Sequence, residues 1–386
     1  MKLSKFFLLS LCALPLAGCS DSDEPNDALN EADAKELTLK AATEAYVDNT
    51  VLPTYKAMAD AAISMRDLCH AMQTKHSEGT LTQADVKAAG EAWKLARKHW
   101  ELSEAFLFGP AANHNIDPHI DSWPLDKAAM ENLLVQIRNG NSWSLENNGG
   151  YGLIGFHSVE FMLFQLSADE NSSLVHSTDY TAEELEYLVA VADDLCQQCV
   201  CLEACWAGME NISAAKQEIL EEAELDYGEE YGWEMKNAGR PGSRFKTYQE
   251  AAEEIIQGCI DIADEVGNTK IGRPHIGSSL EDKNYIESPY SLNSIEDFAD
   301  NIRSVRNSYL GSRSGDASVS DYVKSVNAAA DAEVRKAIDD AIAAIELIPE
   351  PFAKNATGAL SEAAMKAAGE TLVDALEKAM SAVTGH

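Results

Sequence analysis

The sequence predicts an all-α protein built from two helical-bundle domains. Nearly every long segment places apolar residues with the 3.6-residue period of an amphipathic helix, and the alternation typical of strands is scarce. Beyond the N-terminal segments about 350 residues remain, which is more than one hydrophobic core usually serves. A polar connection at 171–178 divides the helices into two groups. We therefore expect one bundle at 36–172 and a second at 173–386.

Residues 1–18 have the pattern of a bacterial lipoprotein signal peptide. Lys2 and Lys5 precede an apolar stretch at 6–14 that is too short to span a bilayer as a mature helix. Leu-Ala-Gly-Cys follows and resembles a lipobox, whose chemistry is cleavage before Cys19 and lipidation of that residue. Several acyl chains would then hold the protein on a membrane.

The segment 19–35 is expected to be a disordered tether. Its first residues are polar and acidic and show no apolar periodicity. They also resemble the acidic surface-export tag of Bacteroidetes lipoproteins. The expected location is therefore the cell envelope, with the lipid anchor in the outer membrane and the chain exposed at the cell surface.

The predicted helices are bounded by recognisable start and stop signals. Thr82 and Thr181 are expected N-caps, Gly109-Pro110 is a stop signal, and Pro53 is expected to kink or break the first helix. In chain order, the helices are predicted at 36–75, 82–108, 125–139, 152–167, 181–224, 247–266, 294–310, 320–347 and 357–383. The predicted irregular segments are 113–123, 227–245 and 267–289, and the length of the last one suggests a functional loop.

The net charge of the chain limits the classes of partner that it is expected to bind. Asp and Glu number 64 against 30 Lys and Arg, which gives a formal net charge of −34. Nucleic-acid binding requires Lys and Arg to neutralise phosphates, so the chain is not expected to bind nucleic acid. The same charge favours solubility and attracts cations weakly.

Six cysteines follow Cys19 in the chain. An exported protein meets an oxidising environment, so some could pair, but the sequence does not choose among the connectivities. Cys196 and Cys199 form a CxxC, yet no second CxxC or nearby His completes a tetrahedral zinc set. We favour small buried residues or one or two disulfides over a metal site. The six residues are Cys69, Cys196, Cys199, Cys201, Cys205 and Cys259.

The stretch 155–160 reads Gly-Phe-His-Ser-Val-Glu, a GxHxxE motif inside an apolar run. His157 and Glu160, three residues apart, lie on one face of a helix. If that helix is a core helix, both side chains are buried, and a buried carboxylate needs a cation, a proton or strong hydrogen bonds. The pair is therefore a candidate site for iron, manganese or zinc, and a hydrogen-bonded structural pair is the alternative.

A second set of chemically notable residues occupies one helix face. Trp93, Arg97, Trp100 and Glu104 recur at helical spacing. The tryptophans are typical core residues. A buried Arg97 with Glu104 requires partners, as part of a polar network, an anion site or an interhelical salt bridge.

The loop 113–124 carries further metal-capable side chains. His114, Asp117, His119 and Asp121 fall within it, although polar loops are commonly just solvated. Asp121 or one of the two histidines is our candidate for an additional ligand. HExxH, GxSxG, P-loop and GxGxxG patterns are absent from the sequence.

Four stretches together resemble the imelysin (peptidase M75-like) family over about residues 36–383. The GxHxxE motif with Gly155, the Trp-x-x-x-Arg-x-x-Trp segment that closes with Phe-Gly-Pro at 108–110, and Ile-Asp-Ser-Trp-Pro-Leu at 120–125 resemble its signatures. Pro-Tyr-Ser at 289–291, Asp-Phe-x-Asp-Asn-Ile at 297–302 and Asn-x-Tyr-x-Gly at 307–311 resemble its C-terminal signature. Flanking signature positions matched by this chain are Trp93, Arg97, Trp100, Glu104, Asp121 and Trp123.

The resemblance implies two helical domains with GxHxxE near their interface, in an envelope protein linked to iron acquisition. It implies metal binding through His157 and Glu160, with iron favoured and zinc the alternative, and transport or uptake components of the outer membrane as partners. We expect a binding protein rather than an enzyme, because no complete catalytic set is evident. The alternatives are a metal-dependent peptidase of the M75 type and an envelope interaction protein with a structural His–Glu pair.

Overall fold

The computed structural model describes residues 24–145, 150–165 and 174–385, with side chains from residue 33. Over these ranges the chain forms helices and no strand, as the periodicity predicts. No helix among them is both long and apolar enough to cross a membrane. The predicted signal peptide and Cys19 lie outside the described residues.

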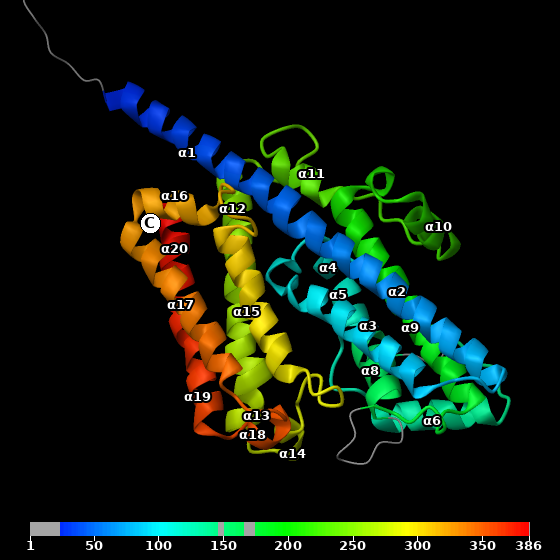
Figure 1. Cartoon of the computed structure of the whole chain (residues 1–386). Helices are drawn as coiled ribbons and strands as arrows, with labels where there is room; N and C mark the ends of the chain where they lie inside the picture. The colour runs from blue at the N-terminus through cyan, green and yellow to red at the C-terminus, as the bar shows by residue number, and fades with distance from the viewer. Residues whose placement is uncertain (1–23, 146–149, 166–173, 386) are drawn as a thin grey trace, which may run out of the picture.

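The first bundle is built around two long helices, α2 and α9, that pack along each other, with α3 against α2 and α8 against both α3 and α9 (Figure 1). The shorter helices α4, α5, α6 and α10 pack around this group. The helices are α2 Leu52–Ser77, α3 Gln83–Glu101, α4 Pro110–Asn113, α5 Ile116–Ile120, α6 Lys127–Arg138, α8 Gly155–Phe164, α9 Ala182–Ala207, α10 Ala214–Glu222 and α11 Tyr231–Lys236.

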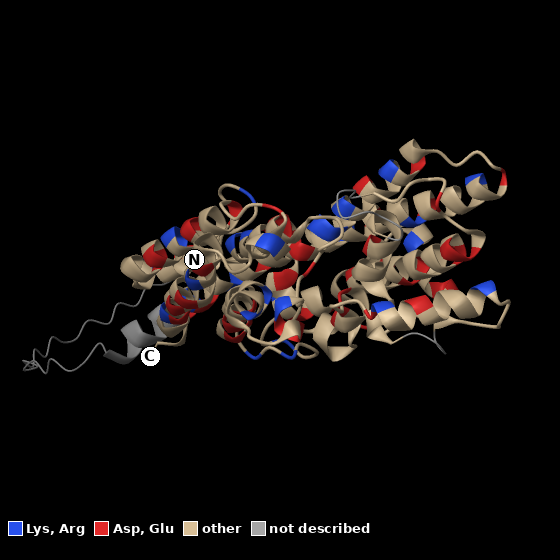
Figure 2. Ribbon diagram, turned by 90° about the horizontal axis from the view of Figure 1, so that it is seen from below, with Lys and Arg blue, Asp and Glu red and all other residues tan. Residues whose placement is uncertain are grey.

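The second bundle packs α12 against α15 and α20, and α17 against α15 and α20. It contains two π-helical segments, η5 at Glu265–Ile271 and η6 at Ala367–Leu372, which contact each other. The helices are α12 Tyr248–Asp264, α13 Gly272–Ile276, α14 Leu280–Lys283, α15 Ser294–Leu310, α16 Val319–Val326, α17 Ala328–Glu346, α18 Phe352–Asn355, α19 Ala359–Lys366 and α20 Val373–Thr384. Acidic positions are spread over both bundles (Figure 2).

One long helical stretch runs over both bundles. Helix α1 (Glu24–Tyr46) packs on α12 and α16 of the second bundle, the π-helical segment η1 (Val47–Val51) follows, and α2 continues into the first. Pro53 does not break the stretch: it lies at the start of α2, directly after the π-helical segment η1. Helix α1 begins before residue 36, so residues 24–35 of the expected tether are helical here.

Several boundaries differ from the prediction, and each difference has a local cause. Helix α9 ends at Gly208, whose φ of +88° stops it, so the predicted helix at 181–224 is two helices. The segment 267–289, predicted as a loop, contains part of η5 together with α13 and α14. Helix α9 also packs with α2 and α8, so the helices of the first bundle extend past the predicted boundary at residue 173.

The predicted helix starts at the two threonines are confirmed. Thr82 and Asp85 form a capping box at α3, and Thr181 and Glu184 form another at α9. Helix α8 is buried along its whole length, from Gly155 to Phe164, which confirms that the apolar run is a core helix. Helices α3 and α15 contact each other where the two bundles meet.

Candidate functional site

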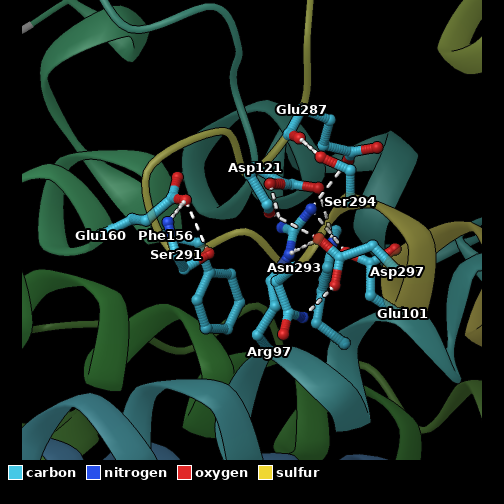
Figure 3. Close-up of polar contacts among 12 residues, drawn as sticks. Arg97, Glu101, Asp121, Phe156, Glu160, Glu287, Ser291, Asn293, Ser294 and Asp297 are labelled. Atoms are coloured by element: carbon cyan, nitrogen blue, oxygen red, sulfur yellow. Dashed lines mark hydrogen bonds and ion pairs between the residues drawn. The ribbon is translucent and has the colours of Figure 1, made fainter. Parts of the chain in front are cut away.

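A buried arginine lies where the two bundles meet. The Arg97 side chain, from α3, is fully buried and contacts four carboxylates. Its Nε donates to Asp297 at 3.2 Å and its Nη2 to Glu287 at 2.7 Å, both from the second bundle. Asp121 accepts from Nη1, and Glu101 Oε1 lies 2.5 Å from Nη2. Figure 3 shows these groups converging on the guanidinium.

Lys270 is a second buried cation in the same cluster. It comes from η5, and its Nζ lies 3.0 Å from Glu287, 3.6 Å from Glu104 and 3.8 Å from Glu101. Glu287 therefore contacts both cations through the same oxygen, Oε1. The carboxylates that surround the two cations outnumber them, so the cluster has excess negative charge that protons or another cation must balance.

His157 contacts both Asp121 of this cluster and Glu160, the last residue of the GxHxxE motif. Its Nδ1 lies 3.1 Å from Glu160 Oε2, and its Nε2 lies 3.1 Å from Asp121 Oδ1. The other oxygen of Glu160 accepts from the backbone N–H groups of Tyr290 and Ser291, at 3.0 and 2.8 Å, and from the Ser291 hydroxyl at 2.7 Å. A carboxylate of the first bundle is thus held by a loop of the second.

Trp93 and Trp100, which share one face of α3, hold the groups around His157 in place. Trp93 Nε1 donates to the carbonyl of Phe156 at 3.0 Å, and Trp100 Nε1 donates to Asp121 Oδ2 at 2.8 Å. Both indoles are fully buried. They pack as core residues and also orient the backbone and the carboxylate beside His157.

Gly155 allows the end of α5, at Ile120, to approach the start of α8. Its φ is +75°, and a Cβ at this position would lie 2.2 Å from the carbonyl oxygen of Ile120. A side chain cannot fit against that backbone oxygen. The glycine of the motif therefore lets Asp121 reach His157.

Burial and charge shift the protonation of these groups in opposite directions. Burial alone lowers the pKa of His157, but the carboxylates of Asp121 and Glu160 outweigh it and raise the pKa to about 9. Burial alone raises the pKa of Asp121, but Arg97 and His157 hold it far below its usual range. For Glu101 burial prevails and raises the pKa well above its usual value. His157 is therefore an imidazolium at neutral pH when no metal is bound.

In metal-free protein we expect the free energy of unfolding to fall as the pH rises from about 6.5 to about 9. The pKa of His157 is higher in the folded than in the unfolded state, so its stabilisation is complete below pH 6.5 and is lost as the pH passes through 9. Urea unfolding in chelator-containing buffer across this range measures the effect. His157→Gln should flatten the dependence, and His119→Gln should leave it unchanged. An identical slope in wild type and His157→Gln would contradict the assignment.

Three donor groups converge on one point of the cluster. Ligand atoms of Asp121, His157 and Glu287 all lie within 4.8 Å of one another, and so do those of Glu101, Glu104 and Asp121. Buried atoms in this region that lack a well-aligned hydrogen bond are His157 Nε2, Glu287 Oε2 and Glu101 Oε1. Of these three atoms, His157 Nε2 and Glu101 Oε1 still lie within ion-pair distance of Asp121 and Arg97, respectively, whereas Glu287 Oε2 makes no hydrogen bond or ion pair with the described residues. A mixed imidazole and carboxylate set fits a divalent transition metal.

The structure brings most of the sequence-predicted residues together. The residues around Arg97 and His157 are Trp93, Arg97, Trp100, Asp121, Gly155, His157 and Glu160, and Glu104 joins them through Lys270. Trp123 lies apart and packs against Tyr285, with ring centroids 4.0 Å apart and ring planes tilted by 43°.

The two loop histidines do not join this cluster. His119 pairs with Asp194 on α9 at 2.9 Å, and His114 lies 3.2 Å from Glu229. Of the candidates for an additional ligand, Asp121 is therefore the one beside His157.

Sequence reasoning missed several residues of the cluster. Glu101 carried a signal, because it lies four residues after Arg97 on the same helix. Glu287 lies two residues before the Pro-Tyr-Ser stretch at 289–291, and Asp297 belongs to the C-terminal signature itself, although neither was predicted to join the site. Nothing in the local pattern around Lys270 marks it as buried.

Comparisons with known proteins agree with this fold. The imelysin family profile matches residues 51–383. The chain is 28% identical over 313 residues to iron-regulated protein A of Synechococcus elongatus, covering 81% of this chain and 75% of the relative. A crystal structure from Parabacteroides distasonis that carries the name iron-regulated protein A precursor superposes with a TM-score of 0.74 at 27% identity, covering 90% of this chain and 95% of that one.

A more distant structure shows the same fold. The imelysin-like protein of Psychrobacter arcticum is 13% identical, with a TM-score of 0.57, and the match covers 90% of this chain and 93% of that one. The family match covers most of the chain, including α2 to α20 and every residue named in the buried cluster. The chain belongs to the imelysin family.

Proposed function

We propose that this protein binds a divalent transition metal, iron in the first place, in the buried cluster between its two bundles, and that it serves metal uptake at the cell envelope. The observation that carries the proposal is the convergence of Asp121, His157 and Glu287. The similarity to proteins named iron-regulated protein A favours iron over zinc.

The contacts favour different roles for the two residues of the motif. His157 Nε2 lies 3.1 Å from Asp121 Oδ1, and His157, Asp121 and Glu287 offer ligand atoms within 4.8 Å of one another, so Nε2 is the proposed ligand atom. Glu160 contacts the opposite nitrogen, and its Oε1 is already bound by three donors. A carboxylate on the far nitrogen of a metal-binding histidine fixes the ring and raises its basicity. We therefore infer that Glu160 positions His157, although the sequence suggested a direct ligand.

Envelope attachment is the second half of the proposal. The lipobox-like segment that ends at Cys19 supports an acyl anchor in the outer membrane. Incorporation of labelled palmitate into wild type and its loss in Cys19→Ala would test the anchor independently of metal binding. Uptake components at that membrane are the proposed partners.

Calorimetric titration of metal-free protein with Fe²⁺ under anaerobic conditions, and with Zn²⁺, tests the site. We expect one site in wild type, its loss in His157→Gln, and about 10–100-fold weaker binding in Glu160→Gln, as for other residues that orient a ligand. His119→Gln is the matched control, because His119 also pairs with an aspartate but lies outside the cluster.

Two outcomes would contradict the proposal. One is the absence of binding to wild type, with His157→Gln lowering only thermal stability, which would make the His–Glu pair a structural element of the interface. The other is equal affinity in His157→Gln and His119→Gln, which would place any bound metal elsewhere.

A further inference from the structure

Two groups of metal-capable atoms meet at Asp121. The first is the site proposed above, in which Asp121, His157 and Glu287 offer ligand atoms within 4.8 Å of one another. The second consists of Glu101, Glu104 and Asp121, which satisfy the same distance and offer carboxylate oxygens alone. A carboxylate has two oxygens, so Asp121 is able to serve an ion on either side of it. Helical bundles build two-metal centres from inward-facing carboxylates of this kind.

A lysine side chain of the second bundle lies between the two groups. Lys270 is 1% exposed, and its Nζ lies 3.0 Å from Glu287 Oε1, 3.6 Å from Glu104 Oε1 and 3.8 Å from Glu101 Oε2. It thus contacts two members of the all-carboxylate group and one member of the group that contains His157. Its ammonium brings one positive charge to the place where a second metal ion would balance these carboxylates.

Glu104 is the carboxylate that depends most on this lysine. Its side chain is buried, and among the described residues it forms an ion pair with Lys270 alone. Glu101 pairs with Arg97 as well, but Arg97 also contacts Asp121, Glu287 and Asp297. Without the ammonium, the all-carboxylate group therefore keeps negative charge that the shared guanidinium does not balance.

The backbone holds the lysine in this position. Lys270 belongs to the π-helical segment η5, and such segments often occur at functional sites. A Cβ on Gly267 would lie 2.3 Å from the backbone nitrogen and Cα of Gly369 in η6, so the two segments touch through their backbones. Just after η5, a Cβ on Gly272 would lie 2.5 Å from the carbonyl oxygen of Gly267. The side chain therefore starts from a closely packed point of the second bundle.

We propose that Lys270 limits the cluster to one metal ion, because its ammonium takes the place of a second ion beside Glu101, Glu104 and Asp121. The inference rests on the proposed function for the first ion. A group of three carboxylates suits a hard divalent cation such as Mn²⁺. Lysine satisfies the same group with a single charge, and its covalent tether prevents it from leaving as an ion does. Removal of the ammonium should therefore open a second metal site.

Manganese titration of metal-free protein tests the inference. Free Mn²⁺ gives an electron paramagnetic resonance (EPR) spectrum that diminishes on binding, so bound ions are counted directly. We expect one equivalent for wild type, two for Lys270→Met and one for Lys270→Arg, which keeps the charge. The two ions in Lys270→Met share Asp121 and should give a spin-coupled spectrum. Binding by Lys270→Met that does not exceed wild type overturns the inference, and so does a spin-coupled pair in wild type.

Lys216 supplies the matched control. It is 3% exposed, and its Nζ lies 2.5 Å from Glu203 Oε2 and 2.6 Å from Asp60 Oδ1. Within the part of the chain that the structure describes, its two partners do not belong to a group of three converging ligand atoms. Lys216→Met should therefore bind as many Mn²⁺ ions as wild type. An equal gain in Lys216→Met and Lys270→Met would overturn the inference, because loss of any buried lysine would then suffice.

A second substitution locates the gained ion. Glu104 belongs to the all-carboxylate group and not to the other, so adding Glu104→Gln to Lys270→Met should remove the gained ion and leave the first. A gain that survives this change contradicts the inference. Adding His157→Gln instead should remove the first ion and keep the gained one. If wild type binds neither Fe²⁺ nor Mn²⁺, the proposed function fails, and the gain of one ion in Lys270→Met still decides whether Lys270 excludes a metal.

The fold of each variant is checked by circular dichroism, because removal of a buried cation is destabilising. Where Lys270→Met is unfolded without metal, refolding in Mn²⁺ becomes the measurement. Refolding with two ions bound supports the inference, since the metal then replaces the ammonium. Failure of Mn²⁺ to restore the fold overturns it.

Discussion

Replacing Arg97 with methionine is expected to lower the free energy of unfolding by about 3–5 kcal/mol, the usual effect of removing one partner from a buried ionic network. Four carboxylates contact Arg97, and without it Lys270 is the remaining cation beside Glu101 and Glu287. Methionine fills a similar volume, so most of the loss is electrostatic. Urea unfolding followed by circular dichroism measures the difference.

Measurements at lower pH distinguish the electrostatic loss in Arg97→Met from a simple packing defect. Carboxylates that lose their cation gain protons more readily in the folded than in the unfolded state, so the deficit of Arg97→Met should shrink as the pH falls. Arg240→Met is the control, because Arg240 is exposed and should tolerate the change. A deficit in Arg97→Met that matches the control would show that the guanidinium is not what balances the cluster.

Replacing Gly155 with alanine is expected to cost about 3 kcal/mol and to weaken metal binding. The positive φ costs a non-glycine residue about 1–3 kcal/mol, and overpacking against fixed backbone adds a similar amount. The carbonyl oxygen of Ile120 would have to move, because the new Cβ would lie 2.2 Å from it. Asp121 would move with it, away from His157. Thermal unfolding and Fe²⁺ titration of the variant measure the two effects.

Gly79 offers a control that separates the backbone strain of a positive φ from the steric clash with Ile120. Its φ is +71°, close to that of Gly155, but a Cβ there would meet nothing within 4 Å. Gly79→Ala should therefore show the strain alone and leave Fe²⁺ affinity unchanged. Equal losses in the two variants would mean that the contact with Ile120 is relieved without displacing Asp121.

The helices could be predicted from the sequence where neighbouring residues determine their start or their burial. The capping boxes at Thr82 and Thr181 are patterns of four residues, and the buried run of α8 is visible as unbroken apolar sequence. The segment 267–289 could not be predicted in the same way. Its glycines and Pro274 indicate a loop, but Gly267 packs directly against Gly369 of another helix, and this distant contact stabilises helical turns there.

The same distinction applies to the candidate site. His157 and Glu160 are recognisable because one helix carries both, and Arg97 because tryptophans flank it on one face. Glu287 meets Arg97 across 190 residues of sequence, and Lys270 joins the cluster through Glu287. No local period encodes such a meeting, so only the folded arrangement shows that Glu287 lies between two cations.

The continuous helical stretch from α1 to α2 forms a common axis for the two bundles. Thr50 in η1 lies 2.8 Å from the Ser312 hydroxyl just after α15, so this axis is also fastened near its midpoint. Any rotation that opens the interface must bend the axis or break that fastening. Helix α1 and η1 therefore constrain how far the two bundles can separate around the buried cluster.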